Sequence, residues 1–200
     1  MFVYCNNSPV CYFDLTGEDA IWLQDKDAVG GLGHSGLLLQ DENGQWLHFY
    51  WGSNRGGFSG KTGSYEFLEP YGGDLSFEGI NKHYSANDPE KGYEKMIYFE
   101  GDFSGSISYI YDLQRKNFSY DLLYRNCVQV TKRALLRGNF KKYDFFYKKI
   151  LKEDNALIPN LYFNHVNSEV IKLRTAEFLF YVSRAAGKRI ATKLIGGLFS

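Results

Sequence analysis

Residues 33–51 read GHSGLLLQDENGQWLHFYW, and this stretch decides the fold class. Two largely apolar runs, residues 34–40 and 45–51, flank the turn sequence DENG at residues 41–44. This pattern predicts two antiparallel strands joined by a tight turn. A three-residue loop with Gly44 in the left-handed conformation is typical of a type I turn followed by a bulge.

The predicted hairpin also fixes which side chains share a face. In its register Leu38 faces His48, and His34 lies on the same face four residues farther along. At about 3.3 Å per residue, that separation keeps the two imidazoles out of hydrogen-bond reach unless a bulge intervenes. Tyr50 and Asn54 share the face and lie nearer to His34.

The remaining patterns predict an α+β domain. The chain has 200 residues, enough for one large domain with its own core, and 18% of them are aromatic, which favours strands and tight packing. Residues 18–29 are expected to be an acidic, linker-like stretch, and residues 53–73 mostly a loop. Further strands are predicted near residues 65–68 and 95–99, and helices at residues 106–116, 143–152 and 168–184, with a break at 158–160.

Residues 125–138, RNCVQVTKRALLRG, predict a helix of about three turns that begins at Cys127. Asn126 is a favourable N-cap and Gly138 a favourable residue just past the end. A thiol at a helix N-terminus lies where the helix dipole stabilises a thiolate. His34 is the expected general base, which takes the thiol proton and later gives one to the leaving group. The alternative for Cys127 is a buried structural thiol.

The composition limits other chemistries. The three cysteines, Cys5, Cys11 and Cys127, are odd in number and widely spaced, so they indicate no disulfide framework. No C-x-x-C pair exists and the histidines are scattered, so no metal or organic cofactor is expected. No signal peptide and no stretch of transmembrane length is recognisable. The formal net charge is zero, but the second half is basic, which suits an anionic membrane or simply a solvated helical face.

A His opening a strand in Gly-His-x-Gly, then a hairpin, and much later an Asn-Cys opening a helix, resembles the permuted NlpC/P60 branch of the papain-like superfamily. The lecithin:retinol acyltransferase-like and YiiX-like enzymes belong to this branch, in which His precedes Cys. The resemblance covers roughly residues 32–138. It implies an antiparallel sheet packed against the nucleophile helix, with Cys127 as nucleophile and His34 as base. The family uses a polar group on the next strand to orient the base, for which His48 is the tentative candidate. Extra helices are expected from about residue 140.

Residues 2–17, FVYCNNSPVCYFDLTG, resemble the junction that ends the core of Rhs/YD-repeat proteins. The resemblance implies that residues 18–200 form a variable C-terminal effector, often a toxin, secreted or delivered into a target cell by a repeat-built shell and paired with an immunity protein. The alternative is an ordinary N-terminal hairpin.

The sequence therefore predicts a cysteine-dependent hydrolase or acyltransferase acting on an amide or ester. An amide substrate would be a peptide or peptidoglycan, and an ester substrate would be a lipid, which the basic C-terminal region suits. The competing hypothesis is a non-catalytic binding module. A nuclease and a nucleic-acid partner are not expected, because no cluster of metal-binding side chains is recognisable.

Overall fold

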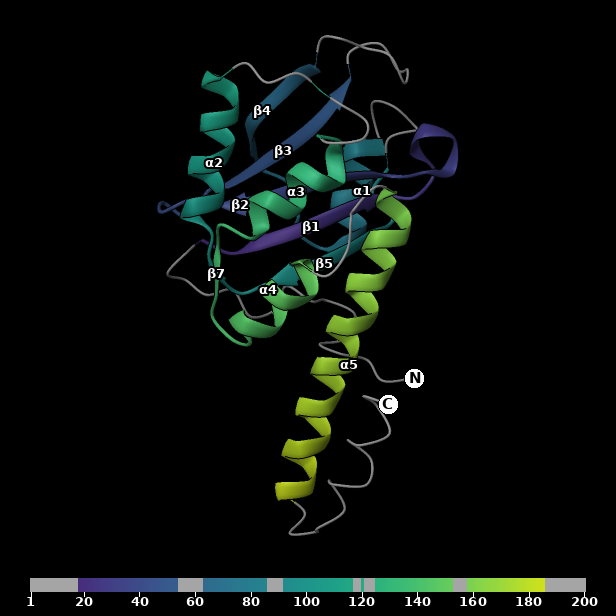
Figure 1. Cartoon of the computed structure of the whole chain (residues 1–200), viewed down its shortest axis with the longest axis vertical. Helices are drawn as coiled ribbons and strands as arrows, with labels where there is room; N and C mark the ends of the chain where they lie inside the picture. Colours follow the sequence, from purple (N-terminus) through teal and green to yellow (C-terminus); the bar gives the residue numbers. More distant parts are fainter. Residues whose placement is uncertain are drawn as a thin grey trace. The chain divides into compact units, whose positions relative to one another are not determined.

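A computed structural model describes residues 18–53, 63–85, 92–116, 120, 125–152 and 158–185 (Figure 1). The junction predicted at residues 1–17, together with Cys5, Cys11 and Asn54, lies outside the described residues. The chain divides into two compact units, residues 1–162 and 163–200. The first unit therefore extends past residue 140, where the sequence predicted the helical extension to begin.

The first unit contains a five-stranded antiparallel sheet with strand order β4-β3-β2-β1-β5. A two-stranded sheet pairs β6 with β7. The α+β class predicted from the sequence is confirmed. The strands are β1 Ala20–Asp25, β2 His34–Gln40, β3 Trp46–Ser53, β4 Gly63–Tyr71, β5 Lys95–Phe99, β6 Gly101–Asp102 and β7 Asn139–Phe140.

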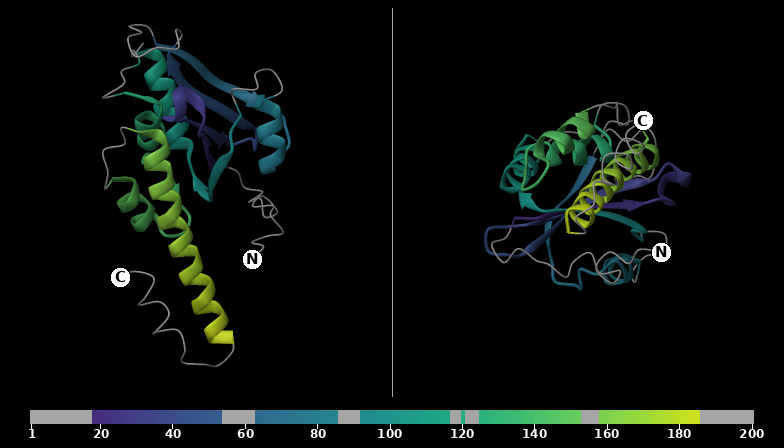
Figure 2. Two further views of the ribbon diagram at one scale, coloured as in Figure 1. Left: turned by 90° about the vertical axis from the view of Figure 1, so that its right-hand side faces the viewer. Right: turned by 90° about the horizontal axis from the view of Figure 1, so that it is seen from below.

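Helices cover both faces of the large sheet. Figure 2 shows α1 on one face and α2 and α3 on the other. None of the described helices, α5 included, combines the length and the apolar character that a membrane span requires. The helices are the 3-10 turn η2 Ala28–Gly31, α1 Phe77–Ser85, α2 Ser104–Arg115, α3 Cys127–Leu135, α4 Asp144–Lys152 and α5 Pro159–Ala185.

The sheet has an apolar core on each side because its strands alternate. On the α1 side, Leu38 and Trp46 pack with Ile80 of α1 and with Tyr93. On the other side, α2 and α3 are fixed to each other by the Ser106 hydroxyl, which donates to the Ala134 carbonyl at 2.6 Å. Helix α3, which begins at Cys127, and strand β2, which begins at His34, thus belong to one packed unit.

The hairpin has the predicted register. Leu38 pairs with His48, and the Asp41 N–H donates to the Gln45 carbonyl at 2.9 Å. Gly44 has φ +78° and its N–H donates to the Asp41 carbonyl at 2.9 Å, as the turn type requires.

Several elements differ from the sequence-based prediction. The acidic stretch predicted as a linker contains β1, whose six residues are all buried between β2 and β5. Helix α1 was not predicted. Strand β4 includes the strand predicted near residues 65–68 but extends over residues 63–71, within the stretch expected to be mostly a loop. Helix α5 begins at Pro159 rather than near residue 168, because proline at the first helical position needs no N–H partner.

Gly138 does not serve as a left-handed helix cap, since its φ is not among the positive values of the described glycines. A Cβ there would lie 2.2 Å from the Phe103 ring, so this glycine allows close packing instead.

Candidate active site

Cys127 opens α3 through a complete capping box. The Asn126 side chain accepts from the Gln129 N–H at 2.9 Å, and the Gln129 side chain accepts from the Asn126 N–H at 3.2 Å. The preceding residue is also held, because the Trp51 indole N–H donates to the Arg125 carbonyl at 2.8 Å. The predicted N-cap is confirmed, and the thiol lies on the first turn of a helix whose N-terminus is fixed by these hydrogen bonds.

The Cys127 sulfur is surrounded by backbone N–H groups. Those of Ser35, Val128 and Cys127 itself lie close enough to lower the pKa of the thiol. Burial acts in the opposite direction and is the larger effect, because only 3% of the residue is exposed. The net result raises the pKa of the thiol to about 11. The sequence predicts that the helix N-terminus and His34 together favour a thiolate, whereas burial favours the protonated thiol.

His34 is the first residue of β2 and is also buried, with 8% exposed. Its ring lies against the Tyr50 ring, with 4.4 Å between the ring centres. Its Nε2 atom has no hydrogen-bond partner within the described part of the chain. Burial lowers the pKa of the imidazole to about 4, so the ring is neutral near pH 7 and can accept a proton.

The two side chains approach the same end of the sheet from different sides. Strand alternation places His34 on the α1 face with Leu38, while α3 packs on the opposite face. The sulfur nevertheless reaches the backbone N–H of Ser35, the residue next to His34. Cys127 also lies close enough to Tyr93, on the α1 face, to contribute to the raised pKa of its hydroxyl. The thiol thus lies near the backbone of the residue that follows His34, but His34 Nε2 does not hydrogen-bond the sulfur.

His48 does not contact His34. It lies on the same face at the predicted distance along the hairpin, and its Nε2 is 3.2 Å from the Tyr93 hydroxyl. A Cβ on Gly36 would lie 2.5 Å from that hydroxyl, so the second glycine of Gly-His-x-Gly makes room for Tyr93. Burial lowers the pKa of His48 to about 3, with His34 a further cause. His48 therefore connects to the site through Tyr93.

Asp25 is a candidate site residue that the sequence argument missed. It pairs directly with His34 across β1 and β2, which places the two Cβ atoms about 5 Å apart on one face. Only 4% of Asp25 is exposed. Its Oδ1 accepts the N–H groups of Asp27 and Ala28, both at 3.0 Å, and burial raises its pKa. A fixed carboxyl group thus occupies the strand position directly opposite His34.

A polar network on the α3 face holds the turn that leads into β2. The Ser35 hydroxyl donates to Gln24 Oε1 at 2.7 Å, and Gln24 Nε2 donates to Asn160 Oδ1 at 2.9 Å. Asn160 Nδ2 donates to the carbonyls of Lys26 and Gly31, both at 2.8 Å. Both ends of the Gln24 amide are therefore engaged, and the backbone on either side of His34 is fixed.

Among the described residues, no three His, Cys, Asp or Glu side chains lie close enough together to hold a metal ion. Comparisons with protein-family models, with curated proteins and with solved structures give no match for this chain.

Proposed function

We propose that this protein is a cysteine-dependent hydrolase or acyltransferase of the permuted NlpC/P60, papain-like type, with Cys127 as nucleophile and His34 as general base. The observation that supports it best is the environment of the sulfur. A thiol on the first turn of a capped helix lies close to backbone N–H groups that lower its pKa, one of them that of Ser35, the neighbour of a histidine whose Nε2 has no partner among the described residues.

The proposed first step begins from a neutral pair. The Cys127 S–H proton passes to His34 Nε2 while the sulfur attacks a carbonyl carbon and the carbonyl electron pair moves to oxygen. The N–H groups of Cys127 and Val128, which lie close to the resting sulfur, are the donors that the resulting oxyanion would take over. When the tetrahedral intermediate collapses, the leaving group takes the proton from His34 and a thioester remains. Water or another acceptor then attacks the thioester and releases Cys127.

Proton transfer has to accompany attack, because the two pKa values oppose a resting ion pair. A thiol at about 11 and an imidazole at about 4 leave the proton on sulfur by many powers of ten. Asp25 is the residue opposite His34 on the neighbouring strand. Its carboxyl group is the nearest candidate to stabilise the positive charge that develops on the imidazole. We assign it as a positioning residue, in place of a direct contact from His48.

The same two values favour one alternative. A buried, protonated thiol beside a neutral histidine is also what a non-catalytic binding module would contain. Delivery as the C-terminal effector of an Rhs/YD-repeat protein, with an immunity partner, is part of the proposal and rests on residues 2–17 of the sequence.

The test is acylation by p-nitrophenyl acetate, with Cys5 and Cys11 replaced by Ser. The proposal expects a stoichiometric burst and an acetyl group that mass spectrometry places on Cys127. His34→Ala should slow the burst by about 100-fold or more, while the exposed His165→Ala serves as a matched control and leaves the rate unchanged. A burst that is indifferent to His34, or no adduct on Cys127, would establish the binding module instead.

A further inference from the structure

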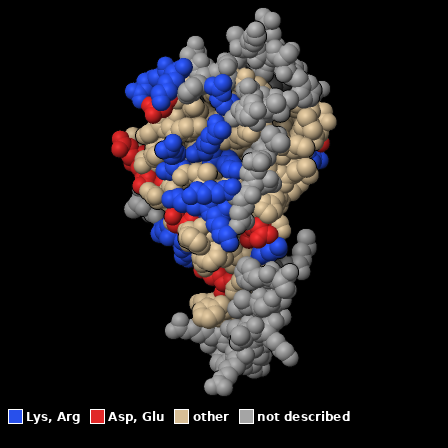
Figure 3. Space-filling view, viewed as in Figure 1, with Lys and Arg blue, Asp and Glu red and all other residues tan. Residues whose placement is uncertain are grey.

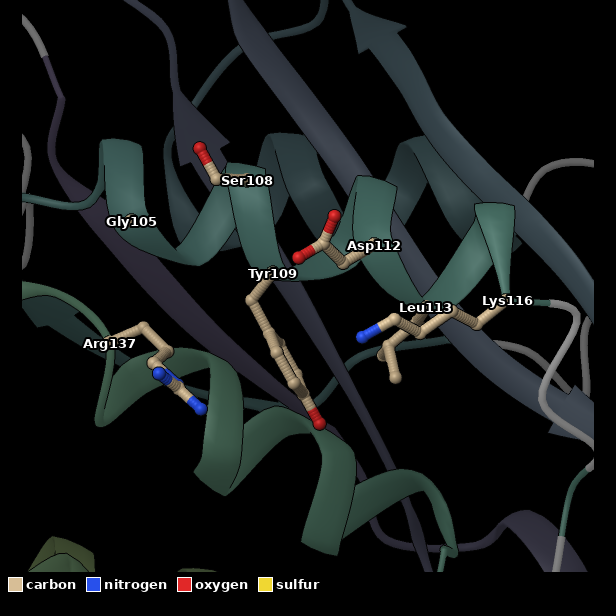
Figure 4. A pocket seen from close by; sticks show the side chains of 7 residues that line it. All are labelled: Gly105, Ser108, Tyr109, Asp112, Leu113, Lys116 and Arg137. Carbon is tan, nitrogen blue, oxygen red and sulfur yellow. The ribbon is translucent and has the colours of Figure 1, made fainter.

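A polar cavity lies on the α2–α3 side of the first unit. Its volume is about 260 Å³, and its lining includes Ser108, Tyr109 and Asp112 of α2, with Lys116 and Arg137 from the residues that follow α2 and α3 (Figure 4). Drug-sized ligands occupy cavities of about 300–1,000 Å³, so this one fits a smaller group. We propose that it binds a phosphate group of a phosphate ester.

The cavity has firm walls. Gly105 brings α2 so close to the chain after α3 that a Cβ there would lie 2.4 Å from the Arg137 carbonyl oxygen. The buried hydrogen bond from Ser106 to Ala134 fixes the same two helices one position farther on. The cavity is therefore part of the helix packing and needs no rearrangement to form.

The charges at the cavity favour an anion. Asp112 forms an ion pair with Arg115, which leaves the two lining cations, Lys116 and Arg137, without a carboxylate partner among the described residues. Arg133 adds a third cation, because its side chain hydrogen-bonds the Tyr109 hydroxyl and lowers the pKa that burial raises. Figure 3, in the same view as Figure 1, shows Lys and Arg side chains gathered on this face.

Tyr109 distinguishes the cavity from an ordinary cationic helix end. Lys116 and Arg137 follow the C-termini of α2 and α3, where helix dipoles alone favour cations. The dipoles do not account for a half-buried phenol between them, with the Arg137 guanidinium 5.7 Å from its ring centre. The Arg137 guanidinium supplies N–H donors in one plane, and the Tyr109 hydroxyl supplies a single O–H donor. Phosphate oxygens can accept hydrogen bonds from both groups.

The cavity is separate from the proposed catalytic pair. Cys127 starts α3 and Arg137 follows its end, so about 15 Å of helix lies between them at 1.5 Å per residue. Phosphate binding therefore does not require the thiol, and Cys127→Ala should bind phosphate as the wild type does. Phosphate binding at this cavity can therefore be tested whether or not Cys127 is a nucleophile.

The experiment is an NMR titration of the full chain with inorganic phosphate, followed at the amides of Ser108 and Tyr109. We expect saturable shifts, and an affinity about tenfold weaker in Lys116→Gln and in Arg137→Gln. Lys152→Gln, an exposed lysine outside the cavity lining, is the matched control and should change the affinity by less than about twofold. Shifts that do not saturate, or equal losses in all three variants, would overturn the proposal.

Vesicle binding distinguishes two sources of the phosphate group, a lipid headgroup and a soluble phosphate ester. Binding to phosphatidylcholine vesicles that contain phosphatidylglycerol, lost in Arg137→Gln, would identify a lipid headgroup. Saturable phosphate binding without vesicle binding would identify a soluble phosphate ester, and both results support the cavity's chemistry. An acidic peptide that binds at these residues while phosphate does not would refute it and indicate a protein partner.

Discussion

Replacing Gly36 by Ala tests the packing that links His48 to the active-site end of the sheet. The new Cβ would lie 2.5 Å from the Tyr93 hydroxyl oxygen and 3.1 Å from Cζ of the same ring. The first distance is about 1 Å shorter than an ordinary contact. The hydroxyl must therefore move by about that amount, which breaks its 3.2 Å hydrogen bond to His48 Nε2.

Overpacking of this kind costs about 1–3 kcal/mol of unfolding free energy. Tyr93→Phe should cost a similar amount, about 1–3 kcal/mol, because it leaves the buried His48 nitrogen without its partner. In the double variant the 2.5 Å contact no longer exists, and the nearest remaining contact is 3.1 Å. We therefore expect the double variant to be less destabilised than the sum of the two single variants by about 1 kcal/mol.

Urea unfolding followed by tryptophan fluorescence measures all four proteins of this cycle. Gly72→Ala is the matched control, because a Cβ at Gly72 meets nothing within 4 Å. If Gly36→Ala is no more destabilising than Gly72→Ala, or if the two effects simply add, Tyr93 does not occupy the space above Gly36.

Three further outcomes are expected. Asn160→Ala removes three hydrogen bonds of the side-chain amide and should lower the unfolding free energy by about 2–3 kcal/mol in urea; a loss below about 0.5 kcal/mol would contradict the network. Gly138→Ala places a Cβ 2.2 Å from the Phe103 ring and should cost about 1–3 kcal/mol, and a melting temperature equal to that of the wild type would refute this packing. The pKa values of His34 and His48, about 4 and about 3 in the fold, lie below the unfolded value of 6.5, so the unfolded chain binds protons first as the pH falls. The stabilisation from these two neutral rings is complete above pH 6.5 and is lost toward pH 4–3; between pH 7 and 5 the unfolding free energy falls by about 2 kcal/mol per histidine. His48→Gln should therefore lose less unfolding free energy over this range than the wild type. An equal loss in the two proteins would contradict a buried neutral His48 ring.

The elements that the sequence predicted are those whose signals are local. The hairpin follows from two apolar runs around DENG, and the start of α3 follows from Asn126 and the helix pattern after it. The sequence did not predict strand β1, because the polar side chains in and next to this strand have partners far away in the sequence. Gln24 of β1, for example, donates to Asn160 Oδ1 at 2.9 Å, 136 positions later, and Asp19, directly before the strand, accepts the Gly101 N–H at 2.9 Å.

The candidate site was predictable in its residue types and not in its electrostatics. Cys127 and His34 belong to short motifs, but the pKa of each depends on burial by elements far away in the chain. Asp25 could be found only after β1 was recognised, since a strand there would pair with β2 through the Gly-rich turn and place Asp25 opposite His34.

Asn160 has a consequence for the order in which the molecule is assembled. The turn that precedes His34 is fastened by a residue about 130 positions later, so this corner closes only when nearly the whole first unit is present. A contact of such long sequence separation forms late, because the loop-closure entropy is lost before the contact forms. During synthesis the end of the sheet that carries His34 and packs near Cys127 is therefore completed last. A chain that ends before residue 160 would hold both residues without the hydrogen bonds that fix the turn before His34.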